Sequence, residues 1–532
     1  MKVKEFFGKA LETLLSHDLF RIVVLVMVVV RTSAFLSPVI GPFVKFTIVW
    51  AVLILIRDLF TQRLFLVNRY RLILYLFLIS YGITALLNRD ENFARNIAML
   101  GYIMVNMLVL YAYEPKRSVG QVKKELLRFS HVFLITTFIC QFISLVTFVL
   151  NINFAYMVGE DVYYYGIYDG RLWGVLSNPN AASFCAVISF MLTTLCLLIQ
   201  KGNIPRRWQV FYWVSGITEL LVFFLCNSRT SLIVTCAFII LFFLLMTIPA
   251  LYQLREDKKA WKIKLRNLII SCILAPLALL GAHEYAIDLL PNLVIQNTAI
   301  SEQVTESLES YTNSSAAVTA IENSDVLERE NFGSAFGGRY YLWQAGAEIV
   351  KSSPLFGVGN DNVPTFAYRY AARYYTAFAT NVYLPGVAGG LHNLFVQIAA
   401  ASGLVGLALF CLLAVMVLVR SVRYYIWMVK QNQLNRVAVT CFCIVAVILM
   451  RTMTDTGIVY GLYYLGVVFW TILSGLMYFM DHDYTEGRKP VGAWIEERLF
   501  HPHQQKAAPW TQAPSKTGGM KKLSLFKAGS QS

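Results

Sequence analysis

The sequence predicts an all-α polytopic membrane protein, a bundle of about twelve transmembrane helices with one large extracytoplasmic loop. The first observation is composition, because 57% of the 532 residues are hydrophobic and only 14% are charged. The second is that the apolar residues form runs of about 18 or more, the length of a helix that crosses a bilayer. The third is that no segment alternates at the spacing of outer-membrane barrel strands.

The apolar runs place the spans along the chain. Arg31 and Lys45 interrupt the first pair of runs. The expected spans lie near 18–37, 40–56, 72–88, 95–113, 130–151, 181–200, 209–226, 230–250, 267–285, 392–419, 437–452 and 459–480.

Lys and Arg residues occupy alternate connections between these spans, and this predicts the orientation. They gather near 2–9, 57–71, 116–128, 201–207, 255–266 and 420–436. The short connections of the other set hold only scattered cations: Arg89, Arg95, Arg229 and Arg451. Because cytoplasmic loops carry the excess of Lys and Arg, we expect both termini in the cytoplasm and the protein in the cytoplasmic (inner or plasma) membrane. The net charge of +15 follows from this bias and does not indicate nucleic acid as a partner.

Four regions are expected. They are N-terminal transmembrane helices at 1–285, a large extracytoplasmic loop at 286–391, C-terminal transmembrane helices at 392–480 and a disordered basic cytoplasmic tail at 481–532. Within the loop, the acidic insert 301–331 is expected to be flexible or weakly helical, and we assign it no role. Residues 339–351 predict a short amphipathic helix against the membrane surface, with Tyr340, Trp343, Ala347 and Val350 at helical spacing.

Polar clusters from distant parts of the chain all fall on the outer side in this topology. They lie at 169–182, 226–231, 337–343, 354–362 and 391–395. Arg451 and Asp455 lie at a sixth outer boundary. Their convergence on one membrane face predicts a functional site there.

Three arginines of these clusters are candidates for binding phosphate. Arg229 lies between two spans with a very short link, where a charge is costly unless it is paired or faces water. A guanidinium at headgroup depth suits a pair of phosphate oxygens. Arg339 begins the amphipathic helix, and Arg171 lies beside Trp173. Contact with lipid headgroups is the alternative for each arginine.

His392 is the candidate catalytic residue. It follows Gly389 and Gly390 at the start of a long apolar helix. A helix N-terminus disfavours the imidazolium, so the neutral ring is able to accept a proton as a general base. A purely structural hydrogen bond is the alternative for an isolated histidine, and the arginines on the same face favour catalysis.

Other side chains have both a functional and a structural interpretation. Asn180 is expected to cap a helix that begins at Pro179, with Asn178 before it. The Tyr-rich loop 156–173 suits stacking on sugar rings and equally suits anchoring at the membrane interface. The outer clusters hold no carboxylate triad, so we expect neither a metal ion nor another cofactor.

At these residues the chain resembles the O-antigen ligase and polysaccharide polymerase superfamily of bacterial membrane proteins. The matching pieces are Asn178-Pro179-Asn180, Ser228-Arg229-Thr230, Arg339 with Trp343, residues 354–362, and His392-Asn393 followed by Gly403 and Gly406. Thr230 departs from the pattern, since Gly is frequent there in the family.

The resemblance implies an enzyme that joins glycans outside the cytoplasmic membrane, with a fold similar to that of metal-independent lipid-linked glycosyltransferases. The donor would be an undecaprenyl-diphosphate-linked saccharide, with Arg229 and Arg339 on its diphosphate and Arg171 as a further candidate. His392 would act on the acceptor hydroxyl. Asn178, Asn180, Trp343 and Asn393 would bind substrate or support the site.

We therefore expect a polymerase of a capsule, exopolysaccharide or O-antigen that works by inverting glycosyl transfer. A ligase that transfers the glycan to a lipid or another acceptor is the alternative. A flippase is disfavoured, because the ionisable residues gather at boundaries rather than in mid-membrane. The expected partners are the lipid-linked donor, a glycan acceptor, membrane lipids, a flippase and a chain-length regulator.

Overall fold

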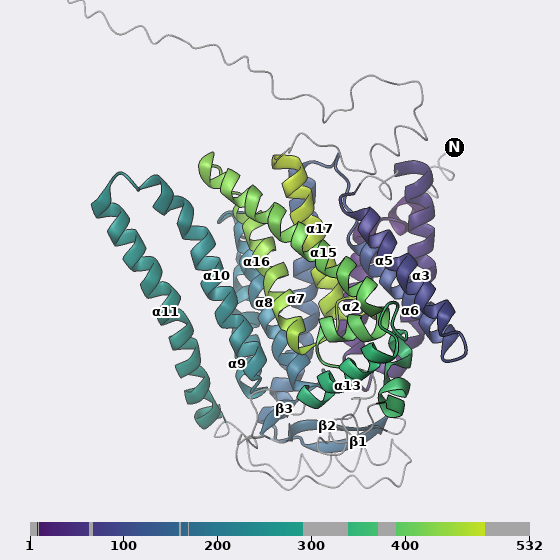
Figure 1. Ribbon diagram of the computed structural model, residues 1–532. Helices are drawn as coiled ribbons and strands as arrows, with labels where there is room; N and C mark the ends of the chain where they lie inside the picture. The colour runs from purple at the N-terminus through teal and green to yellow at the C-terminus, as the bar shows by residue number, and fades with distance from the viewer. Residues whose placement is uncertain are drawn as a thin grey trace, which may run out of the picture.

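The computed structural model describes residues 8, 10–62, 68–158, 161–168, 170–290, 339–370 and 390–484. The acidic insert 301–331 and almost all of the basic tail lie outside the described residues. The predicted all-α membrane fold is confirmed. Figure 1 shows the long helices running side by side through the bundle.

Each of the twelve predicted spans contains one helix. These are α2 (His17–Arg31), α3 (Ser37–Arg57), α5 (Arg71–Leu87), α6 (Phe93–Met104) with its continuation η2 (Val105–Leu110), α7 (Val119–Val149), α8 (Pro179–Gln200), α9 (Arg206–Leu225), α10 (Arg229–Gln253), α11 (Lys258–Leu289), α15 (Leu394–Lys430), α16 (Arg436–Arg451) and α17 (Tyr464–Asp483). Within the described residues, ten helices are long and apolar enough to cross a membrane. The remaining two, α2 and α5, have 15 and 17 residues.

Short polar side chains set where these apolar helices begin. Ser118 forms a reciprocal capping box with Gln121 at the start of α7. Asp257 and Asn435 accept backbone N–H groups at the starts of α11 and α16. Each cap pairs a backbone donor that has no partner within the helix, so the polar residue fixes the boundary of the span.

The Tyr-rich segment is a small sheet, not the expected loop. Strands β1 (Phe154–Val158), β2 (Asp161–Tyr168) and β3 (Arg171–Trp173) pair antiparallel in sequence order. Alternating side chains separate two faces, and buried Tyr165 stacks on Phe154 with the ring centroids 5.0 Å apart. The sheet and helix α13 (Arg339–Ser352) lie at the same end of the bundle, drawn at the bottom of Figure 1.

The predicted amphipathic helix is present as α13, and one of its faces is buried in the protein. The buried residues are Leu342, Ala345, Gly346 and Ile349, whereas Tyr340 and Ala347 are exposed. This face packs on the start of α15, and a Cβ on Gly346 would lie 2.4 Å from Val396 Cγ1. The helix therefore docks on protein through this face, and Tyr340 and Ala347 of the predicted membrane-facing stripe lie outside it.

Helix α15 is broken at Gly403, where φ is 67° and ψ is −175°. The segment 354–359 inserts at this break. The N–H groups of Val358 and Gly359 donate to the carbonyls of Ala400 and Ala401 at 3.0 and 2.9 Å. The break thus leaves carbonyl groups of α15 without a partner inside the helix. The segment 354–359 supplies the N–H groups that these buried carbonyls need. The predicted span at 392–419 is consequently a short helix followed by a long one.

Candidate active site

The chemistry-bearing residues gather at the end of the bundle that holds the sheet and α13, which we call the site end. Helix α15 begins there with Asn393 as its cap, since the Asn393 side chain accepts the N–H groups of Phe395 and Val396 at 3.0 and 3.2 Å. The Asn393 amide also donates to the Met453 carbonyl at 3.1 Å. Asn393 therefore ties the start of α15 to the end of α16.

His392 immediately precedes this cap. Its side chain is half-buried and its backbone is left-handed, with φ 47°. Residues other than glycine rarely adopt this conformation, and such strain is concentrated at functional positions. The Leu391 N–H donates to the Gln397 side chain at 2.9 Å, which holds the turn in place. The first turns of α15 thus hold the backbone turn that carries the imidazole.

The electrostatic surroundings keep this imidazole neutral. Burial is the largest cause and lowers the pKa of His392 to about 4, Asp455 opposes the shift, and Arg339 and Arg451 reinforce it. A histidine with so low a pKa is unprotonated at neutral pH. It is therefore able to accept a proton without first losing one.

Arg451 and Asp455 bring an ion pair to the same place. Arg451 is 2% exposed at the end of α16, and its Nη2 lies 3.1 Å from Asp455 Oδ2. Its Nη1 donates to Thr454 Oγ1 at 2.7 Å, and the guanidinium carbon lies 5.4 Å from the ring centroid of Phe184. Among the described residues, Arg451 Nε has no hydrogen-bond partner. The pair supplies a fixed cation beside His392.

Arg339 reaches this site through the docking of α13. It is the first residue of that helix and is half-buried. The close packing of Gly346 against Val396 brings the helix onto the segment that carries His392. Trp343, one turn further along, is half-buried and packs against the apolar core. The structure thus places Arg339 near enough to lower the pKa of His392, while Trp343 has a packing role.

The two other candidate arginines are Arg171 and Arg229. They lie near the start of α8 and the junction between α9 and α10. Arg171 on β3 is buried, and it donates to the Cys226 carbonyl at 2.9 Å and to Asn180 Oδ1 at 2.7 Å. Ser228 Oγ donates to the same Asn180 oxygen at 3.2 Å. Arg229 follows as the first residue of α10 and is exposed. Arg171 therefore braces the turn that presents Arg229.

The predicted cap of α8 was wrong by two residues. Asn178, not Asn180, caps the helix by accepting the N–H groups of Asn180 and Ala181 at 2.9 and 3.2 Å. Asn180 is instead the shared acceptor of Arg171 and Ser228. Capping depends on the backbone conformation at the helix start, which the run Asn-Pro-Asn alone does not specify.

The first turns of α8 connect the two halves of the site. Asn180 contacts the Arg171 and Ser228 side, and Phe184 lies under Arg451 on the His392 side. Residues four apart on a helix share a face and lie about 6 Å apart along it. One helix start thus links Arg229 to the group formed by His392, Arg339, Arg451 and Asp455.

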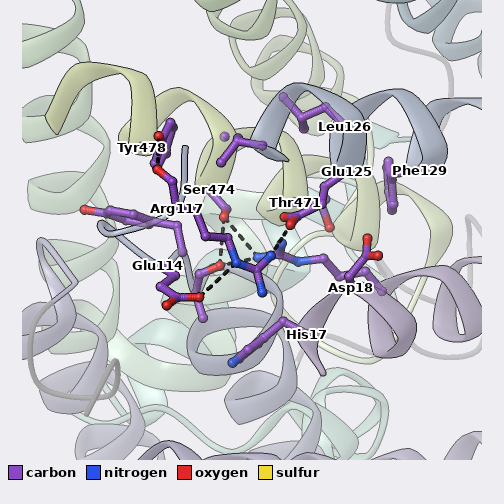
Figure 2. A pocket seen from close by; sticks show the side chains of 15 residues that line it. His17, Asp18, Glu114, Arg117, Glu125, Leu126, Phe129, Thr471, Ser474 and Tyr478 are labelled. Atoms are coloured by element: carbon purple, nitrogen blue, oxygen red, sulfur yellow. Dashed lines mark hydrogen bonds and ion pairs between the residues drawn. The ribbon is translucent and has the colours of Figure 1, made fainter. Parts of the chain in front are cut away.

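A polar cavity opens at the opposite end of the bundle, and it contains none of the predicted site residues. Figure 2 shows its lining by α2, α7, α17 and the segment after η2. Arg117 pairs with Glu114 and Glu125, and buried Arg21 donates to Ser474 Oγ at 3.0 Å. These charges pair largely with one another, which suits a network that ties the helix ends together. Within the described residues, no three His, Cys, Asp or Glu side chains form a group that could hold a metal ion.

Sequence reasoning missed the contacts of three residues. Arg451 and Asp455 were noted only as a boundary pair, although their spacing of four residues at a helix end is typical of an ion pair. Gln397, which donates to Asn360 Oδ1 at 2.8 Å and links α15 to the segment 354–362, had no local signal.

Part of the chain matches a known protein family. Residues 214–411 match the family model described as O-antigen ligase, which is less than half of the chain. This match supports the predicted resemblance to the O-antigen ligase and polysaccharide polymerase superfamily. The matched segment contains Arg229, Arg339, Trp343, His392 and Asn393. Arg171, Asn178 and Asn180 lie before it.

Two curated proteins show similarity over short stretches. The Exopolysaccharide production protein ExoQ of Rhizobium meliloti is 37% identical over 83 residues, 15% of this chain and 18% of its own length. An uncharacterized protein of Haemophilus influenzae is 25% identical over 122 residues, 23% of this chain and 28% of its own length. The chain thus spans between about a fifth and a little over a quarter of the length of these relatives.

Proposed function

We propose that this protein polymerises a surface polysaccharide by transferring a glycan from an undecaprenyl-diphosphate-linked donor on the outer face of the cytoplasmic membrane. The observation that carries the proposal is the convergence of a neutral histidine with Arg339, Arg451 and Asp455 at one end of the bundle. Superfamily membership supports a membrane glycosyltransferase. The site combines a base with fixed cations, as transfer from a diphosphate requires.

In the proposed reaction the acceptor hydroxyl oxygen attacks the anomeric carbon of the donor sugar. The bond from that carbon to the diphosphate oxygen breaks on the opposite face, so the configuration inverts. The hydroxyl proton passes to the His392 ring, and the bond's electron pair leaves with the lipid diphosphate. Asp455 stabilises the imidazolium that forms, because its carboxylate opposes the fall in the pKa of His392.

Fixed arginines supply the charge that the departing diphosphate needs. Arg229 is exposed at the start of α10, and Arg339 is half-buried at the start of α13. We propose that these two residues bind the diphosphate. Arg171 holds in place the turn that carries Arg229. Cations held in place before the reaction stabilise developing negative charge more than mobile water does. We propose that no metal ion is required, and full activity in EDTA is the expected result.

The orientation follows from the charge pattern. The start of α2 and the end of α17 lie at the end opposite the site, where Arg69 and Arg420 pair with Asp481. The Lys- and Arg-rich connections belong to that end, so we place it and both termini in the cytoplasm. A flippase that supplies the donor and a chain-length regulator remain proposed partners.

A ligase remains the second candidate, and the two activities differ only in the acceptor. The description of the matching family favours ligase, whereas the name of the R. meliloti relative favours exopolysaccharide production. Purified protein in proteoliposomes, given lipid-linked repeat units as the only saccharide, distinguishes them. A ladder of longer lipid-linked chains supports the polymerase. If no chains lengthen, and glycan is transferred only when lipid A core is added, the protein is a ligase rather than a polymerase.

A further inference from the structure

Strand β2 carries tyrosines on both faces of the sheet, and the two groups differ in their surroundings. On one face Tyr165 is buried, stacks on Phe154 and shares a hydrogen bond with Thr147 on α7 at 3.0 Å. Tyr163 lies on this face too and packs against the same small apolar cluster. These residues hold the sheet on the bundle. Tyr164 and Tyr168 belong to the other face, since side chains alternate along a strand.

Tyr164 and Tyr168 form a compact aromatic group with Trp173. The two tyrosine rings are stacked, with centroids 3.6 Å apart and an interplanar angle of 4°. Trp173 meets them edge-on, at 5.7 Å from Tyr164 and 6.2 Å from Tyr168. Gly166 lies between the tyrosines with φ 93°, a conformation that suits glycine and bends the strand. We call Tyr164, Tyr168 and Trp173 the aromatic platform.

The aromatic platform shares its sheet face with Arg171. The strand register pairs Tyr168 with Arg171 and Gly166 with Trp173, and directly opposed residues of a sheet point to the same side. Arg171 donates to Asn180, which also accepts from Ser228. The platform therefore adjoins the helix ends that present Arg229.

We propose that the aromatic platform is a carbohydrate subsite that stacks on a sugar ring of the saccharide undergoing transfer. This proposal rests on the proposed function. The C–H face of a pyranose ring is apolar, whereas its hydroxyls project from the rim, so flat aromatic side chains hold the ring and leave the hydroxyls free to react. Tyr164 and Tyr168 are half-buried, which leaves part of each ring accessible to the sugar, whereas Trp173 is buried and supports the two tyrosines from the edge. Anchoring at the membrane interface alone does not call for three rings packed together on one sheet face beside Arg171.

Binding to the full-length protein in nanodiscs tests this subsite. The protein carries His392→Ala, so that no turnover consumes the probe. Three probes are compared: the lipid-linked repeat unit, undecaprenyl diphosphate alone, and the free oligosaccharide released from the repeat. Tyr164→Ala and Tyr168→Ala are expected to raise the Kd for a saccharide probe about tenfold, the size of one lost stacking contact. The Kd for undecaprenyl diphosphate is expected to stay unchanged.

The pattern of lost affinity shows whether the platform contacts the sugar. Weaker binding of the lipid-linked repeat or of the free oligosaccharide, with unchanged binding of undecaprenyl diphosphate, supports the subsite. Tyr163→Ala is the matched control, because it removes a tyrosine from the opposite face of the same strand. If an alanine variant does not fold, Tyr168→Leu keeps apolar bulk without the flat ring.

Unchanged affinity of Tyr164→Ala and Tyr168→Leu for both saccharide probes would overturn the subsite. An equal loss for undecaprenyl diphosphate would do so too, since it would mean a general disturbance of the site. Failure of the proposed function is a separate result: a wild-type protein that transfers no glycan, whatever the platform variants bind.

Discussion

At the scale of single residues, the site depends on how His392 is held. Its left-handed backbone and the cap at Asn393 orient the ring, and its burial removes the proton at neutral pH. Two neighbouring arginines push the pKa down while Asp455 pushes it up. The balance leaves a base that is neutral before the reaction and has a carboxylate nearby once it is charged.

Removing one of these cations is expected to move the pH dependence of the reaction. With a pKa of about 4, the wild-type base stays neutral down to acid pH, so kcat/KM falls only below pH of about 5. Arg339→Gln removes a charge that lowers this pKa, so the acid limb moves to higher pH. Asp455→Asn removes a charge that raises it, so the limb moves to lower pH and the rate falls.

The pH profile of kcat/KM in proteoliposomes measures these shifts. Lys351→Gln is the control, because it removes an exposed cation from the far end of the same helix, where Lys351 pairs with Glu348. If the acid limb keeps its position in both Arg339→Gln and Asp455→Asn, the group whose titration limits the rate is not His392.

The sequence predicted much of the site at this scale. His392, Arg339 and Arg229 do lie at one end of the bundle, because helix boundaries and charge reveal which polar residues share a membrane face. The exchange of roles between Asn178 and Asn180 was not predictable, since it depends on backbone angles at the cap. The role of Arg451 and Asp455 depended on the packing of α16 against α8, which no local pattern encodes.

At the scale of elements, the broken helix α15 positions the segment that carries His392. The short part, 394–402, carries the His392 turn and receives α13, and segment 354–359 pairs its end. Gly403 permits this, because a Cβ there would lie 2.2 Å from the Leu355 carbonyl oxygen. The residues 357–361 are also held by α5 and α6, where the Tyr81 hydroxyl accepts the Asn360 N–H at 3.0 Å.

Gly403→Ala is expected to destabilise the protein strongly. The new methyl group collides with backbone, and the positive φ of 67° disfavours any side chain, so we expect a loss of at least about 3 kcal/mol. Gly281→Ala on α11 is the control, because a Cβ there meets nothing within 4 Å. Thermal unfolding in detergent, followed by circular dichroism, compares the two. A Gly403→Ala protein that unfolds at the wild-type temperature would show that the break is not needed.

Apolar periodicity predicted the helices well and this break poorly. Glycines are common inside membrane helices, so Gly403 alone does not signal an interruption. Its partner segment lies more than forty residues earlier in the chain, beyond the reach of a periodicity argument. The three short strands were missed because the Tyr-rich run also suits a loop at the membrane interface.

At the scale of the whole molecule, the two ends of the bundle differ in chemistry. The site end holds the sheet and α13 (Figure 1), together with Arg339 and Arg451 near His392. The opposite end holds paired charges, among them Arg69 and Arg420 on Asp481 and the cavity of Figure 2. The proposed orientation places catalysis outside and these paired charges at the cytoplasmic boundary.

Single cysteines are expected to report this orientation. Ser352 at the end of α13 and Asn203 between α8 and α9 are both exposed, at opposite ends of the bundle. A membrane-impermeant maleimide added to intact cells or spheroplasts should label Ser352→Cys, whereas Asn203→Cys should react only after permeabilisation. The wild-type protein is the control, because its nine cysteines are buried or half-buried. The reverse labelling pattern would place the site in the cytoplasm.

The most direct test of the central claim is glycan transfer by His392→Ala in proteoliposomes, with lipid-linked repeat units as donor and acceptor. His283→Ala is the matched control, since His283 is another buried histidine near a helix end on the same side. The account predicts that His392→Ala inserts normally and loses transfer by at least about a hundredfold, while His283→Ala keeps it. A well-folded His392→Ala protein that elongates chains at the wild-type rate would contradict it.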